Sequence, residues 1–91
     1  IKLSAQLDDE TKSIAEYWAD GAGTVTPPGH WNEIAQVISQ RDQHTLDDDA
    51  KLFFILDNAL LDSSIACWFV KRFHDSVRPI SAIRFLFQDK N

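Results

Sequence analysis

Two cationic side chains near the carboxyl end of the chain have the types and the spacing to hold a tetrahedral oxoanion. Lys71 is followed by six residues and then by Arg78 and Pro79. In a continuous helix, residues seven positions apart differ by about 20° around the axis and lie about 10 Å apart along it, so they share one face. An arginine offers a planar fork of donors to phosphate-like oxygens, whereas a lysine supplies a compact positive charge. The pair therefore predicts a small anion site at a helix end.

The segment around this pair resembles the first of three signature motifs of the vanadium-dependent haloperoxidase and type 2 phosphatidic acid phosphatase superfamily. The family pattern is Lys, six residues, Arg-Pro, and Lys71, Arg78 and Pro79 match it. Residues 15–21, 26–32 and 59–68 are similar to the helical region before the motif in bacterial haloperoxidase-like members. The resemblance implies that Lys71 and Arg78 contact equatorial oxygens of phosphate or vanadate and stabilise the charge that develops during transfer.

The second and third motifs of that superfamily are missing from these 91 residues. They are Pro-Ser-Gly-His, and Ser-Arg followed by a histidine and an aspartate. In the family they supply the histidine that is the phosphatase nucleophile or the vanadate ligand, and a second histidine that moves protons. The resemblance thus implies no catalytic residue in this chain. We expect a truncated N-terminal portion of a larger enzyme, inactive alone, with vanadate as a possible cofactor of the full-length parent only.

The composition predicts one small helical domain, residues 1–91, with a modest core. Apolar residues make up 44% of the chain and charged residues 25%. Charged residues interrupt the most apolar stretch, so we expect no membrane span. The single cysteine, Cys67, excludes an intramolecular disulfide, and its apolar surroundings predict a buried thiol. The compartment is not indicated.

The net charge of −5 hides an asymmetry along the chain. Residues 1–67 contain four Lys or Arg and twelve Asp or Glu, whereas residues 68–91 contain five and two. Nucleic-acid binding needs a broader basic surface than this short segment offers, so we expect no nucleic-acid partner. A local anion site suits the distribution, and so does the simpler alternative that cations stabilise the end of a helix.

The hydrophobic pattern predicts an all-α fold. We expect helices from Asp8 or Asp9 to Ala19, from His30 to Gln40 and from Leu46 to about His74, with a further short helix possible from Ile80 to Phe87. Thr45 and Asp48 have the spacing of a capping box. The third helix is apolar on nearly every face, which is typical of a central, buried helix in a bundle.

Other polar and aromatic residues have structural explanations. His30, His44 and His74 have no metal-ligand spacing, and the run Asp47–Asp49 lacks the pattern of a calcium loop, so no metal site is predicted. Asp62 interrupts the apolar helix, and we expect a buried ion pair or hydrogen bond there. Trp18, Trp31 and Trp68 are expected to be core anchors.

Two functions remain open at this stage. The first is the oxoanion-binding portion of a haloperoxidase-like or acid-phosphatase-like enzyme, with phosphate or vanadate as the ligand and Lys71 and Arg78 as the binding residues. The second is a stand-alone interaction module. In either case, the apolar third helix predicts a homo-oligomer or contact with the remainder of a parent chain. The expected contact residues are Phe53, Phe54, Leu60, Leu61 and Trp68.

Overall fold

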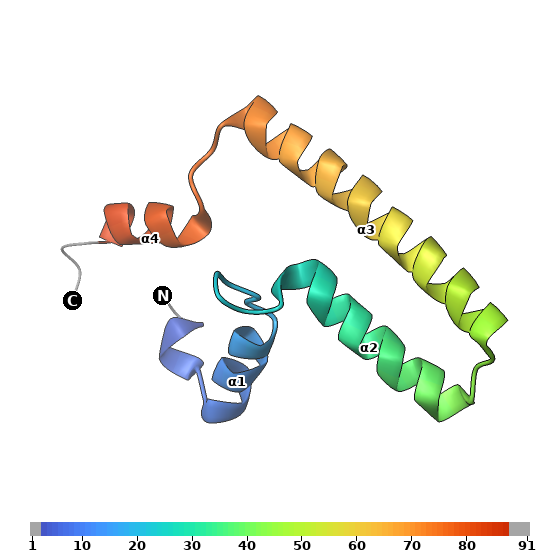
Figure 1. Ribbon diagram of the computed structural model, residues 1–91. Coiled ribbons are helices and arrows are strands. Elements are labelled where there is room, and N and C mark those ends of the chain that lie inside the picture. Colours follow the sequence, from blue (N-terminus) through green and yellow to red (C-terminus); the bar gives the residue numbers. More distant parts are fainter. Residues whose placement is uncertain (1–2, 88–91) are drawn as a thin grey trace. The chain divides into compact units, whose positions relative to one another are not determined.

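The computed structural model describes residues 3–87. In chain order it contains the 3-10 helix η1 (Ser4–Gln6) and the α-helices α1 (Asp9–Tyr17), α2 (Thr26–Asp42), α3 (Leu46–His74) and α4 (Pro79–Phe87) (Figure 1). No strand occurs in this described range, so the prediction of an all-α fold is confirmed.

The chain divides into two compact units, and the boundary falls between Asn58 and Ala59, inside α3. The first unit contains η1, α1, α2 and the amino-terminal half of α3. The second contains the carboxyl-terminal half of α3 and α4. Everything that concerns the predicted anion site belongs to the second unit.

Local side-chain chemistry sets the start of each helix in the first unit. The Thr11 amide donates to the Asp8 carboxylate at 2.8 Å, which caps α1 and lowers the pKa of Asp8, together with the Thr11 hydroxyl. The sequence predicted α2 to begin at His30, but it begins at Thr26. Pro27 and Pro28 lie in its first turn, where a missing amide hydrogen costs no helical hydrogen bond. The prolines therefore begin the helix rather than precede it.

The buried polar group of the first unit is a histidine paired with an aspartate. His30 is only 6% exposed, and its Nδ1 lies 2.9 Å from Oδ1 of Asp20. The imidazole stacks on Trp18 with ring centroids 5.0 Å apart and meets the edge of Tyr17 at 4.5 Å. These contacts confirm the structural role that the sequence predicted for His30.

The prediction that the tryptophans are core anchors is wrong for this chain. Trp18, Trp31 and Trp68 are 51%, 45% and 63% exposed. Trp18 and Trp31 contact each other, with ring centroids 6.0 Å apart, but the described helices leave about half of each side chain exposed. An indole is too large for two short helices to enclose on all faces.

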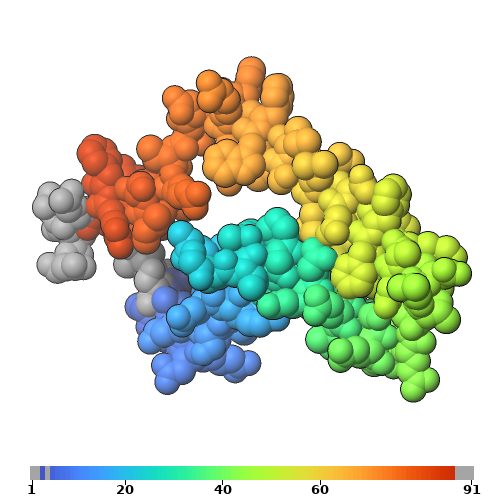
Figure 2. Space-filling view, in the orientation of Figure 1, coloured from blue at the N-terminus to red at the C-terminus, as the bar shows by residue number. Residues whose placement is uncertain are grey.

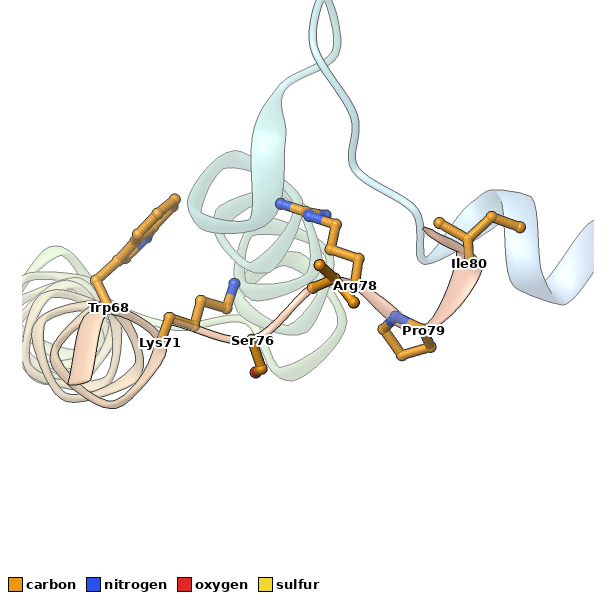
Figure 3. A pocket seen from close by; sticks show the side chains of 7 residues that line it. Trp68, Lys71, Ser76, Arg78, Pro79 and Ile80 are labelled. Atoms are coloured by element: carbon orange, nitrogen blue, oxygen red, sulfur yellow. The ribbon is translucent and has the colours of Figure 1, made fainter. Parts of the chain in front are cut away.

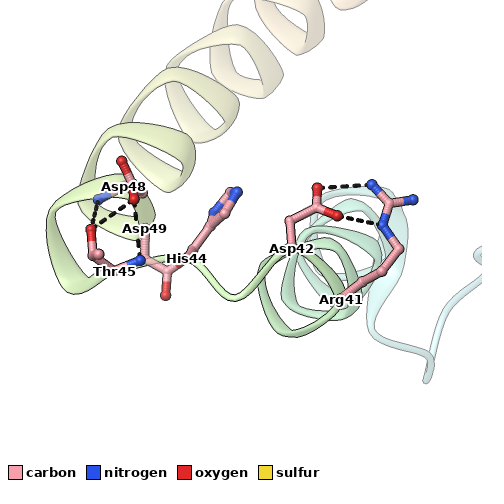
Figure 4. Close-up of polar contacts among 6 residues, drawn as sticks. All are labelled: Arg41, Asp42, His44, Thr45, Asp48 and Asp49. Carbon is pink, nitrogen blue, oxygen red and sulfur yellow. Dashed lines mark hydrogen bonds and ion pairs between the residues drawn. The ribbon is translucent and has the colours of Figure 1, made fainter.

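The predicted capping box begins α3 (Figure 4). The Asp48 amide donates to the Thr45 hydroxyl oxygen at 3.2 Å, and the Thr45 amide donates back to the Asp48 carboxylate at 3.2 Å. The Thr45 hydroxyl also donates to that carboxylate at 2.7 Å, and these bonds lower the pKa of Asp48. Asp49 lies 3.2 Å from Nδ1 of His44, and Arg41 pairs with Asp42 just before the turn. Asp47, Asp48 and Asp49 thus lie in the first turn of α3, where negative charge stabilises a helix.

The bounds predicted for α3 are confirmed, and the described helices leave it uncovered, as its need for further neighbours predicts. No residue between Leu46 and His74 is buried. Phe69 is 70% exposed, Phe73 is 75% exposed, and Cys67, expected to be buried, is also exposed. Figure 2 shows side chains of the second half of α3, coloured yellow to orange, standing out on the face in view. A helix that is apolar all round needs neighbours on every side, and the described helices supply too few.

The apolar character of this region also meets a composition test for membrane spans. The helical stretch Leu46–Phe87 contains an 18-residue window with a mean hydropathy of about 1.4 and no more than two charged residues. The charged residues of this stretch thus do not exclude it by composition, and the expectation of no membrane span stays a prediction. Core helices of soluble proteins pass the same test, so length and composition alone assign no membrane location.

The Thr45 cap gives a direct stability prediction. Thr45→Ala removes the hydroxyl that accepts from the Asp48 amide, so we expect the free energy of unfolding to fall by about 1 kcal/mol. Urea unfolding followed by circular dichroism measures this loss. Ser63→Ala is the control, because it removes an exposed hydroxyl from the interior of the same helix. An equal loss in both variants would contradict a specific role for the cap.

Candidate oxoanion site

A helix break, rather than helical register, brings Lys71 and Arg78 together. α3 ends at His74, and Asp75 has a left-handed φ of 43° while its amide still donates to the Lys71 carbonyl at 3.0 Å. Aspartate tolerates this conformation better than most residues. Residues 75–78 then connect to α4. Lys71 and Arg78 therefore do not share one continuous helix, and the break that Pro79 favours lies between α3 and α4.

Arg78 lies immediately before the first turn of α4. Its carbonyl accepts from the Ser81 amide at 2.9 Å and from the Ala82 amide at 3.1 Å, which begins the helix. Pro79 is the first residue of α4, where its fixed φ suits the helix and no donor is lost. The proline ring also disfavours helical geometry at Arg78. Pro79 thus restricts the backbone of Arg78, which lies at the amino-terminal end of α4.

Lys71 and Arg78 line the same open pocket, which has a volume of about 630 Å³. Figure 3 shows their cationic ends turned to the same side of the connecting segment, together with the Trp68 ring. The lining residues are Trp68, Lys71, Ser76, Val77, Arg78, Pro79 and Ile80. All seven belong to the second unit, so the pocket is complete within one compact part of the chain.

Trp68 makes a contact that the sequence analysis missed. The Lys71 ammonium lies 4.8 Å from the centroid of the Trp68 ring, a cation–π distance. The two residues are three positions apart on α3, where side chains are neighbours on the helix surface. That spacing was visible in the sequence, but Trp68 had been assigned to the core. In the structure it is an exposed wall of the pocket that holds the lysine.

The charge around the pocket favours an anion. Two of its seven lining residues are cationic and none is acidic. The positive end of the α4 dipole adds to this field, because the lining includes the first residues of α4. His74 and Arg84 lie outside the lining. The geometry suits a small ion with several oxygens.

The same lining limits the chemistry that the pocket can perform. Ser76 is its only hydroxyl, and no imidazole, thiol or carboxylate lines the pocket to activate a nucleophile or transfer a proton. No group of three or more His, Cys, Asp or Glu side chains within residues 3–87 is arranged to hold a metal ion. The lining of this pocket thus offers two cations and one hydroxyl, with no imidazole, thiol or carboxylate beside them.

Comparison with protein families connects this geometry to a known group. Residues 51–91 match a family model described as the VCPO second helical-bundle domain, a domain of vanadium haloperoxidases. This segment is similar to that domain of the vanadium haloperoxidases. The match contains the whole pocket, with Lys71, Arg78 and Pro79. Searches of curated proteins and of solved structures gave no match to the chain.

The match confirms part of the resemblance found in the sequence. It supports a haloperoxidase-related origin and a helical-bundle domain, and it does not extend to the phosphatase branch of the superfamily. The similar blocks at residues 15–21 and 26–32 lie outside the matched range, and so does most of the first unit. The relation to vanadium haloperoxidases therefore rests on α3 from Lys51 onward and on α4.

The Trp68 contact gives a prediction that needs no ligand. An ammonium group over an indole face should carry its neighbouring ε-methylene protons into the ring current, so the Lys71 ε-protons should resonate upfield of those of Lys51. Proton NMR with assigned lysine side chains measures the difference. Trp68→Phe should keep part of the shift and Trp68→Leu should remove it. Identical shifts for both lysines in the wild-type chain would contradict the contact.

Proposed function

We propose that this chain provides the first oxoanion-binding element of a vanadium haloperoxidase-like or acid-phosphatase-like enzyme. The observation that carries the proposal is the shared pocket, in which the Lys71 ammonium and the Arg78 guanidinium are turned to the same side. Arg78 would hold two oxygens of a tetrahedral anion with its fork, and Lys71 would contribute a point charge. Both would stabilise negative charge on the equatorial oxygens.

The family relation favours vanadate or phosphate as the anion. When bound in a parent enzyme, vanadate would supply the halide-oxidising chemistry for which the family is named. The lining fits its oxygens, because both cations reach one pocket, but it contains no histidine to bind the metal itself. Lys71, Arg78 and the amino-terminal end of α4 would bind and orient the anion, and the remaining groups would come from elsewhere in a parent enzyme.

The pocket should bind phosphate or vanadate weakly. Two cations without further donors should give a dissociation constant of about 1 mM at best. Titration followed by NMR should move the amide signals of residues 71–81 first. Lys71→Ala and Arg78→Ala should each weaken binding about tenfold or more, because each removes a charge-assisted hydrogen bond.

The chain supplies a close control for that titration. Arg72→Ala removes a cation next to Lys71 that does not line the pocket, so it should leave the affinity nearly unchanged. Equal losses in the Lys71 and Arg72 variants would mean nonspecific attraction and would contradict a defined site. Hydrolysis of a chromogenic phosphate ester that depends on Lys71 would contradict the expectation that the chain alone is inactive.

The exposed apolar surface of α3 favours a second candidate function, a helical interaction module that self-associates. Phe54, Leu61 and Trp68 follow one another at seven-residue spacing and are 70%, 57% and 63% exposed. Residues at that spacing lie on one side of a helix. Phe53 and Leu60, also expected in the interface, are only partly exposed and lie on another side of the helix. The candidate interface is therefore narrower than the sequence suggested.

Self-association through this side of α3 predicts a concentration-dependent molecular mass. Sedimentation equilibrium at micromolar concentration should show a dimer or higher oligomer, and Leu61→Glu should shift it to monomer because a buried carboxylate has no partner there. Ile14→Glu is the control, since Ile14 is comparably exposed on α1. A monomer at all concentrations would exclude this second function without affecting the anion site.

A further inference from the structure

A separate face of α3 combines large apolar side chains with one carboxylate. Asp62, Ala66, Phe69 and Phe73 follow the spacing of four, three and four residues that places side chains on one side of a helix, and Ala59 lies one turn before them. Every residue of α3 from Leu61 onward is exposed. Phe69 and Phe73 are stacked, with centroids 6.5 Å apart, and form a continuous apolar surface.

The carboxylate on this face has no partner in the described structure. Asp62 makes no hydrogen bond and no ion pair with any residue between 3 and 87, although it lies between Ala59 and Ala66 on an apolar helix. When a surface of this kind is covered, an unpaired carboxylate loses its water and must gain a cation or donors in return. A partner that covers this face must therefore bring a cation or hydrogen-bond donors to Asp62.

The neighbours of Asp62 select the shape of the occupant. Ala59 and Ala66 flank it one turn away on each side, so a partner can approach closely at the level of the carboxylate. Phe69 and Phe73 then project farther from the axis. A flat surface would leave a gap over the alanines, where the phenylalanines hold it away. A helix can fill such a gap because its side chains pack between the residues of a facing helix.

The charge on this face disfavours two other occupants. A second copy of α3 in parallel register would place Asp62 against Asp62, and like charges at a covered position repel. A lipid bilayer would surround the carboxylate with hydrocarbon and offer no cation. The face also lies apart from the anion pocket, because the α3 residues that line that pocket, Trp68 and Lys71, point to other sides of the helix.

We propose that the face formed by Ala59, Asp62, Ala66, Phe69 and Phe73 docks an amphipathic helix that carries an arginine or lysine opposite Asp62. The cation pairs with the carboxylate and fixes the register, as a single polar residue does in helical pairs. The apolar residues of the incoming helix cover Phe69 and Phe73. This interaction is independent of oxoanion binding and gives the chain a site for a helical partner.

A peptide selection tests the proposal directly. The probe is a phage-displayed library of helical peptides with a fixed leucine-rich apolar face, in which the central position of that face is varied over all residue types. Selection on the wild-type chain should enrich arginine or lysine at that position, and selection on Asp62→Arg should enrich glutamate or aspartate. An arginine peptide from the first selection should lose about tenfold in affinity for Asp62→Asn, measured by fluorescence anisotropy.

Two controls connect the result to this face. Asp47→Asn makes the same change about 22 Å away on the same helix and should bind the arginine peptide like the wild type. Phe69→Ala should bind it at least tenfold more weakly, while circular dichroism shows that its helix content is unchanged. Both results together place the peptide on the Asp62 face.

Three outcomes overturn the proposal. Enrichment of apolar residues at the central position would show that Asp62 is not paired on docking. Absence of any enriched peptide would show that the face accepts no helix. Binding of the chain to phosphatidylcholine vesicles that blocks the peptide and is unchanged in Asp62→Asn would assign the face to a lipid surface.

Discussion

Pro79 has no amide hydrogen, and its ring clashes with a helical conformation at the residue before it, so α3 and α4 cannot form one straight helix. The chain leaves α3 through the left-handed Asp75 and begins α4 at Pro79. This short connection determines where the guanidinium of Arg78 lies relative to the ammonium of Lys71. It also places the positive end of α4 beside both cations. The anion pocket depends on this break.

Residues close in sequence cap the ends of the helices, whereas the apolar side chains of α3 remain uncovered. Asp8 caps α1, the Thr45–Asp48 box caps α3, and each cap lies within a few residues of the group it satisfies. The sides of α3 need partners distant in sequence, and none of its residues becomes buried. The described residues are thus sufficient to form α3 but not to bury its apolar side chains.

The proposed anion pocket and the proposed docking face on α3 are both incomplete within the described residues. The pocket holds cations for the oxygens of a ligand but no side chain to react with it. The Asp62 face offers a carboxylate and two stacked phenylalanines but no cation to complete them. The relation of residues 51–91 to a helical-bundle domain gives both observations one explanation, since a bundle places further helices around each member.

The sequence by itself determined the local features, which are the all-α class, the bounds of α3 and the capping box at Thr45. These depend on neighbours within a few positions, so residue type and spacing suffice. Only the tertiary structure decided that Trp68 contacts Lys71 instead of anchoring a core, and that Asp62 has no partner among residues 3–87. Burial depends on which distant elements are present to cover a surface, and hydrophobic periodicity records only the need for such cover.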